Sequence, residues 1–138
     1  MLRLAASAAA ALAALVLAVP VMAQEEDPLA QYLWMARPIV IFADTPNDPR
    51  LLHQLREIEG SRDLLEERDV VVIVDTEPGP SRFDTTPLRT KFRPHGFNIL
   101  LIDKDGEVKL RRPSPVTGSQ LARMIDRLPL RQQEMGRR

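Results

Sequence analysis

An unbroken apolar run, Pro38-Ile39-Val40-Ile41-Phe42-Ala43, is followed at once by the polar stretch Asp44-Thr45-Pro46-Asn47-Asp48-Pro49. Continuous apolar residues rich in β-branched side chains are typical of a strand that is buried on both faces. In the polar stretch, Asp48 can accept the free backbone N–H groups of a helix, and Pro49 suits the first helical turn. The two stretches predict a central strand, a loop and a helix.

The chain beyond Pro49 is expected to return to a second strand. Leucine and isoleucine recur at helical spacing as far as Gly60, which can end the helix, and Ser61 can cap a second short helix. Val70-Val71-Val72-Ile73-Val74 is again a continuous apolar run. We therefore expect a parallel pair of strands joined by a right-handed crossover, with Asp75 at the carboxyl end of the second strand.

The C-terminal half carries the signs of a hairpin and a last helix. Proline and glycine in 76–86 indicate a loop, and 88–92 has the length of a short helix. Two apolar stretches, 98–102 and 107–110, flank an Asp-Gly turn and form an antiparallel hairpin. A final helix is expected to start near Thr117 or Ser119 and to end before Pro129.

The resulting order, β-α-β-α-β-β-α, is that of an α/β protein of thioredoxin-like fold, with a central mixed sheet flanked by helices. A ferredoxin-like domain is the alternative, but it expects the hairpin at a different place in the chain.

The first residues have the character of an export signal. Residues 1–23 are almost wholly apolar after Arg3 and end in small residues, so we expect a signal peptide cleaved before Gln24; an uncleaved membrane anchor is the alternative. We divide the remaining chain into a lead (24–36), one domain (37–135) and a tail (136–138). Within the lead, Tyr32, Leu33 and Trp34 are expected to pack in the core. The expected location is periplasmic or secreted, with no stable membrane insertion after cleavage.

Charge and cysteine content exclude several functions. Basic and acidic side chains number 19 each, so no nucleic-acid partner is indicated. The sequence has no cysteine, which excludes disulfide exchange, a thiol nucleophile and a cysteine-ligated metal.

Three segments, 37–43, 101–110 and 125–135, resemble a family known as domain of unknown function 4174. The third is the most distinctive, because Arg131-Gln132-Gln133-Glu134-Met135 continues beyond the expected helix end. The family occurs as small exported bacterial proteins and as modules in animal sushi-repeat-containing extracellular proteins. The resemblance implies a thioredoxin-like fold outside the cytoplasm and a docked tail, with Leu130 on the domain, but no established activity. Asp103 departs from the family, which often has glycine there.

Ligands of open α/β sheets usually bind at the carboxyl ends of the strands. The candidate contacts expected there follow the first strand, end the second, and enter the third: Asp44, Thr45, Asn47, Asp75, His95, Phe97 and Asn98. Capping and turn formation are the alternative explanation for the residues after the first strand. Thioredoxin-like proteins resemble one another in capturing extended peptides beside a proline at the start of the third strand, where this chain has Phe97-Asn98.

Other sites are less well supported by the sequence. Asp44, Asp48 and Asp75 could hold a hard cation, but solvated turn acids explain them better, and we predict no metal and no cofactor. The basic run of Arg89, Lys91, Arg93 and His95 is interpreted as a solvated face, with an anion site as the alternative.

We therefore predict a non-redox binding or interaction module whose partner is an envelope or extracellular protein or peptide. The alternative is a non-thiol enzyme that uses the polar cluster around Asp44, Asp75 and His95.

Overall fold

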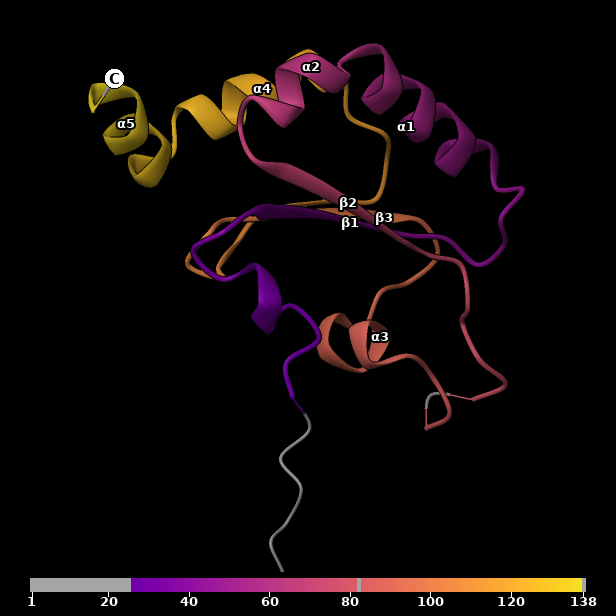
Figure 1. The fold of residues 1–138 in the computed structure, drawn as a ribbon. Helices are drawn as coiled ribbons and strands as arrows, with labels where there is room; N and C mark the ends of the chain where they lie inside the picture. Colours follow the sequence, from indigo (N-terminus) through magenta and orange to yellow (C-terminus); the bar gives the residue numbers. More distant parts are fainter. Residues whose placement is uncertain (1–25, 82, 138) are drawn as a thin grey trace, which may run out of the picture.

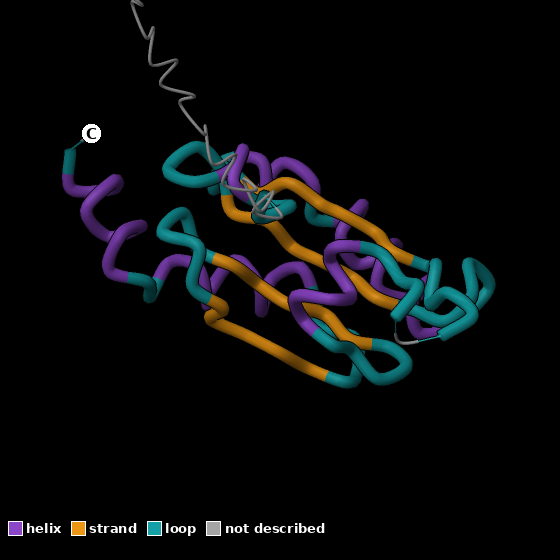
Figure 2. Tube along the Cα trace, turned by 90° about the horizontal axis from the view of Figure 1, so that it is seen from below, coloured by secondary structure: helices purple, strands orange, loops and turns teal. Residues whose placement is uncertain are grey.

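The structure, a computed structural model, describes residues 26–81 and 83–137. Four strands lie side by side in one twisted sheet (Figure 2). They are β1 (Arg37–Phe42), β2 (Val70–Asp75), β3 (Asn98–Ile102) and β4 (Val108–Arg112), in the spatial order β2-β1-β3-β4. β1 runs parallel to β2 and antiparallel to β3, and β3 and β4 form an antiparallel hairpin. The predicted central strand and hairpin are confirmed.

Helices cover both faces of this sheet (Figure 1). One face carries α1 (Pro49–Gly60), α2 (Arg62–Glu66) and α4 (Gly118–Asp126), and the other carries α3 (Pro87–Phe92) and the 3-10 helix η1 (Ala30–Tyr32). A further helix, α5 (Pro129–Gly136), follows α4. The predicted element order is confirmed up to α4. No helix in the described part of the chain is long and apolar enough to cross a bilayer.

β1 supplies the middle of two cores. Its six residues are all buried, because strands lie on both sides of it and helices lie on both faces. Side chains alternate between the faces: Ile39 and Ile41 belong to the cluster that includes residues of α1, α2 and α4, whereas Val40 and Phe42 pack with Phe92 of α3.

β2 differs from the expectation for a continuous apolar run. It lies at the edge of the sheet, and Val72 and Val74 remain 39% and 42% exposed. The run resembles that of β1 in sequence, but only one side of β2 is paired, since no other strand in the described chain lies beyond it.

The predicted cap of α1 is confirmed, whereas Ser61 lies at the N-cap position of α2 without a side-chain cap hydrogen bond. The Asp48 side chain accepts a hydrogen bond from the Arg50 N–H at the start of α1. Thr117 and Gln120 form a reciprocal capping box at the start of α4. Pro129 follows the end of α4 as expected, but it also opens α5, which was not predicted. In α5 the half-buried Leu130 is less enclosed than Arg131, which is 2% exposed.

The N-terminal lead packs differently from the prediction. The proposed signal peptide and cleavage site lie outside the described residues. The prediction of core packing is wrong for Leu33 and Trp34, which are 40% and 65% exposed. The turn of η1 instead directs Leu29 and Tyr32, three residues apart, against the α3 face of the sheet.

Candidate ligand-binding groove

A groove of about 800 Å³ opens where β1 and β2 end and β3 begins. It is lined by residues from the loops after β1 and β2, from α3, and from the segment leading into β3: Asp44, Pro78, Phe83, Thr85, Arg89, Thr90, Arg93, Pro94, His95 and Gly96. Most of the lining surface is apolar.

Arg89 lines this groove and pairs with Asp75, which does not line it, and both residues are 7% exposed. Arg89 donates from Nε to Asp75 Oδ1 at 2.9 Å and from Nη2 to the Ala43 carbonyl oxygen at 2.7 Å. The Thr86 hydroxyl donates to the other Asp75 oxygen. The pair thus joins the ends of β1 and β2 to α3.

The pKa of the Asp75 carboxyl is consistent with an ionised partner of Arg89. Burial alone would raise the pKa of the Asp75 carboxyl, because it disfavours the charged form. Hydrogen bonds from Thr86 and Arg89 outweigh that effect and lower the pKa below its usual value. Asp75 is therefore an ionised partner of Arg89, and its two carboxylate oxygens are already occupied.

Two polar groups of the groove retain hydrogen-bonding capacity. The Nη1 group of Arg89 makes no hydrogen bond to any described residue and lies 3.9 Å from Asp44 Oδ1. The Thr85 hydroxyl oxygen is buried in the groove wall and has no hydrogen-bond partner in the described chain. Both groups can donate, so the groove offers donors to an incoming acceptor.

The structure brings only some of the predicted contacts together. Asp44 and His95 line the groove, and both are exposed. Asp75 is buried and reaches the groove only through its pair with Arg89, whereas Thr45 and Asn47 are exposed on the loop after β1 but do not line the groove. The loop itself ends in the Asp48 cap, so part of its polarity serves helix α1.

The remaining two predicted contacts point elsewhere. Phe97 is 1% exposed and belongs to the core, with the Arg50 guanidinium 5.6 Å from its ring centre. Asn98 is 8% exposed and donates from Nδ2 to the His95 carbonyl oxygen, which fixes the turn into β3. Neither side chain lines the groove.

Sequence reasoning missed Phe83, Thr85 and Arg89. The interpretation of the basic run as a solvated face is wrong for Arg89, which the Asp75 carboxylate holds in the interior. The predicted helix over 88–92 already contained Arg89; the Thr86-Pro87 pair could have fixed its start and so placed this arginine in the first turn, because threonine caps helices and proline favours their first turn.

The described residues assemble neither a metal centre nor an acid-base pair at the groove. Within residues 26–81 and 83–137, no three His, Asp or Glu side chains are grouped so that they could hold a metal ion. No hydrogen bond or ion pair joins the His95 side chain to Asp44 or Asp75 in that part of the chain.

Solved structures with the same fold are thioredoxin-like. A chloroplastic thioredoxin z matches 66% of this chain and 76% of its own, with 23% identity and a TM-score of 0.51. The reduced 2-Cys peroxiredoxin of Plasmodium vivax matches 78% of this chain and 84% of its own, with 13% identity and a TM-score of 0.56. At these identities the likeness establishes the thioredoxin-like fold alone.

No curated protein matches the chain. The family model described as "Domain of unknown function (DUF4174)", in contrast, matches residues 28–134. This span includes every strand of the sheet and both helical layers, and the protein therefore belongs to the DUF4174 family.

Proposed function

We propose that this protein is a non-redox binding module that takes an extended peptide of a partner protein into the groove at the carboxyl ends of β1 and β2. The observation that carries the proposal is the combination of an apolar groove with two donors that make no hydrogen bond to a described residue: the Thr85 hydroxyl, and Arg89 Nη1, whose one nearby carboxylate in the described chain is Asp44 at 3.9 Å. An extended peptide supplies carbonyl acceptors at regular intervals and apolar side chains between them.

The groove's surroundings suit such a ligand. Phe83 is 85% exposed and, with Pro78 and Pro94, offers apolar contact area. Arg89 is held in place by Asp75 and the Ala43 carbonyl, so its donor is pre-organised and loses little freedom on binding.

The absence of cysteine supports the non-redox part of the proposal, because thiol-disulfide exchange needs a thiolate nucleophile. We expect the purified protein to show no insulin-reductase and no peroxidase activity. Measurable thiol turnover by the pure protein would contradict this expectation.

Export belongs to the same proposal. The apolar residues 4–23 and the small residues before Gln24 support secretion to the periplasm or beyond, where an envelope or extracellular protein would supply the peptide. Mass spectrometry of the protein from cell fractions tests this: we expect a product that begins at Gln24 outside the cytoplasm, whereas a cytoplasmic product that retains Met1 would refute export.

Selection from a displayed library of random unstructured peptides tests the binding function. We expect enriched peptides whose affinity falls at least about tenfold in Phe83→Ala and in His95→Ala, since each substitution removes groove surface. Asn47→Ala is the matched control, because Asn47 is exposed on the adjoining loop but does not line the groove. Failure to enrich any peptide, or equal binding by all four proteins, would refute the proposal.

A further inference from the structure

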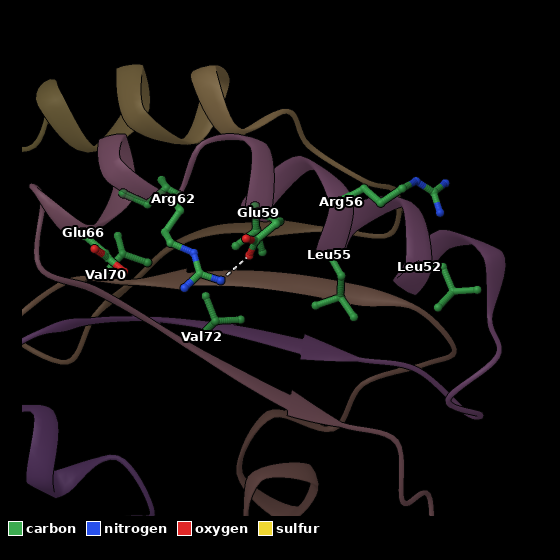
Figure 3. Close-up of a pocket in the computed structure, with 10 residues that line it drawn as sticks. Leu52, Leu55, Arg56, Glu59, Arg62, Glu66, Val70 and Val72 are labelled. Carbon is green, nitrogen blue, oxygen red and sulfur yellow. Dashed lines mark hydrogen bonds and ion pairs between the residues drawn. The ribbon is translucent and has the colours of Figure 1, made fainter.

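A second groove, of about 640 Å³, lies on the face of the sheet that α1 and α2 cover, between these helices and the edge strand β2 (Figure 3). Leu52, Leu55 and Ile58 of α1 and Val70 and Val72 of β2 line it, together with Leu65 of α2. Leu52 and Val72 are exposed, Leu55, Ile58 and Val70 are half-buried, and Leu65 is buried. Most of the surface that lines this groove is apolar.

The backbone beside this groove is an open strand edge. The carbonyl oxygens of Asp69 and Asp75 accept hydrogen bonds from β1, at 2.8 and 3.1 Å. Backbone groups alternate in direction along a strand, so the groups of Val70, Val72 and Val74 point away from β1. β2 pairs with no other described strand, and these three residues are therefore free to form a new ladder.

The charged side chains on the rim of the groove alternate in sign. In chain order they are Arg56, Glu59, Arg62 and Glu66. Arg62 and Glu59 are paired with each other, at 60% and 67% side-chain exposure. Figure 3 shows these two side chains above Val72. Arg62 lies on the side of Val70 and Glu66, whereas Glu59 lies on the side of Leu55.

This pattern is self-complementary about Val72. A two-fold axis through Val72, perpendicular to the sheet, places a second copy of β2 antiparallel to the first, with Val72 opposite Val72 and Val70 opposite Val74. The same axis sets Arg62 of one copy opposite Glu59 of the other, and Arg56 opposite Glu66. Opposite charges therefore face each other along the whole seam.

We propose that β2 is a self-association edge, at which two copies of this chain pair antiparallel through Val70, Val72 and Val74 to form one continuous sheet. The apolar side chains of Leu52, Leu55 and Val72 from both copies fill the space under the α1 helices. This interface is separate from the peptide groove at the carboxyl ends of the strands, and its test is independent of that function.

Sedimentation equilibrium of the purified protein measures the association. We expect the wild type to be a dimer at about 100 µM. Val72→Pro should be a monomer under the same conditions, because proline removes the outward N–H group at the centre of the seam and leaves the pairing with β1 intact.

Charge reversals keep the test informative if Val72→Pro fails to fold. Arg62→Glu and Glu59→Arg should each weaken the dimer at least about tenfold, because each sets like charges across the seam. A mixture of the two variants should form heterodimers in native mass spectrometry, and the double variant Glu59→Arg/Arg62→Glu should regain the dimer. Arg123→Glu, an exposed site on α4 near Arg112 of β4, makes the same charge change away from β2 and should leave the dimer unchanged.

A wild-type monomer at about 100 µM would overturn the proposal, and β2 would then be open to pairing with a strand of a different protein. A dimer that survives both Val72→Pro and the two charge reversals would also overturn it, because such a dimer would use another surface.

Discussion

The Arg37 guanidinium lies fully buried at the start of β1 and donates from Nε to Oδ1 of Asp103, just after β3, over 2.9 Å. The same guanidinium donates from Nη1 and Nη2 to the two carboxylate oxygens of Glu134 on α5, at 3.2 and 3.0 Å. One cation thus connects the central strand, the hairpin turn and the last helix. Asp103 supplies one of the two carboxylates.

Removing Asp103 should be costly, because it leaves a buried charge without one of its partners. We expect Asp103→Ala to lower the free energy of unfolding by about 3–5 kcal/mol. The double variant Arg37→Met/Asp103→Leu should lose less free energy of unfolding than Asp103→Ala, since it removes the buried charge together with its partner. Denaturant titrations at neutral pH compare the two, and a larger loss in the double variant would contradict this account.

The carboxylate of Glu134 makes stability depend on pH. Burial alone would raise the pKa of Glu134, but hydrogen bonds from Arg37 and Lys104 outweigh it and lower the pKa to about 2. The folded state therefore holds the proton less tightly than the unfolded state, whose glutamate pKa is about 4.3. The resulting stabilisation, at most about 3 kcal/mol, is complete above the unfolded pKa and is lost as the pH falls toward 2.

Glu134→Gln isolates this contribution from the other carboxylates. At pH 7 we expect the variant to unfold at lower denaturant concentration than the wild type, by about 1–3 kcal/mol. The difference should shrink as the pH falls below about 4 and approach zero near pH 2. Urea titrations at several pH values measure it, and a difference independent of pH would show that Glu134 acts through packing alone.

Local sequence chemistry predicted the elements because their signals lie within a few residues of each other. Asp48 and Pro49 mark the start of α1, and Thr117 marks that of α4. The run 38–43 identified the central strand for the same reason. β2 has the same character as β1 in sequence, so its place at the edge could not be read from its residues, since it depends on which strands pair.

Buried arginines show why charged pairs, including the one at the candidate groove, were not predicted from the sequence. Arg37 meets Asp103 across 66 positions of sequence and Glu134 across 97. Arg89 meets Asp75 across 14, and it looks in sequence like any other member of a basic run. Charged side chains are rarely buried unless paired, and a pair distant in sequence leaves no local pattern. Asp44 and His95 were found because the fold itself places them at strand ends.

Gly118 allows a close approach between α4 and the junction of α1 and α2. A Cβ at this position would lie 2.1 Å from the Ser61 hydroxyl oxygen and 2.9 Å from the Glu57 carbonyl oxygen. We expect Gly118→Ala to destabilise the fold by about 1–3 kcal/mol, with partial recovery in Gly118→Ala/Ser61→Gly. Gly60→Ala is the control, since nothing lies within 4 Å of its added Cβ, and it should be neutral or slightly stabilising. Thermal melts of the variants decide the matter: equal destabilisation by both alanines would contradict the packing explanation.

The tail after α4 should be part of the folded domain, because α5 docks through its charges more than through its apolar residues. Arg131 is 2% exposed and lies 3.5 Å from both Asp126 and Glu134, and Glu134 also pairs with Lys104 at 2.8 Å. Truncation after Leu128 removes Arg131 and Glu134 and leaves the buried Arg37 with fewer partners.

We therefore expect truncation after Leu128 to lower the free energy of unfolding by at least about 1 kcal/mol, as the loss of partners for a buried charge requires. Truncation after Met135, which is 40% exposed, retains both charged residues and should be nearly neutral. Denaturant melts of the two proteins compare these losses directly. Equal midpoints would show that α5 contributes nothing to the fold, and would leave the segment from Pro129 onward free to serve as an interaction motif.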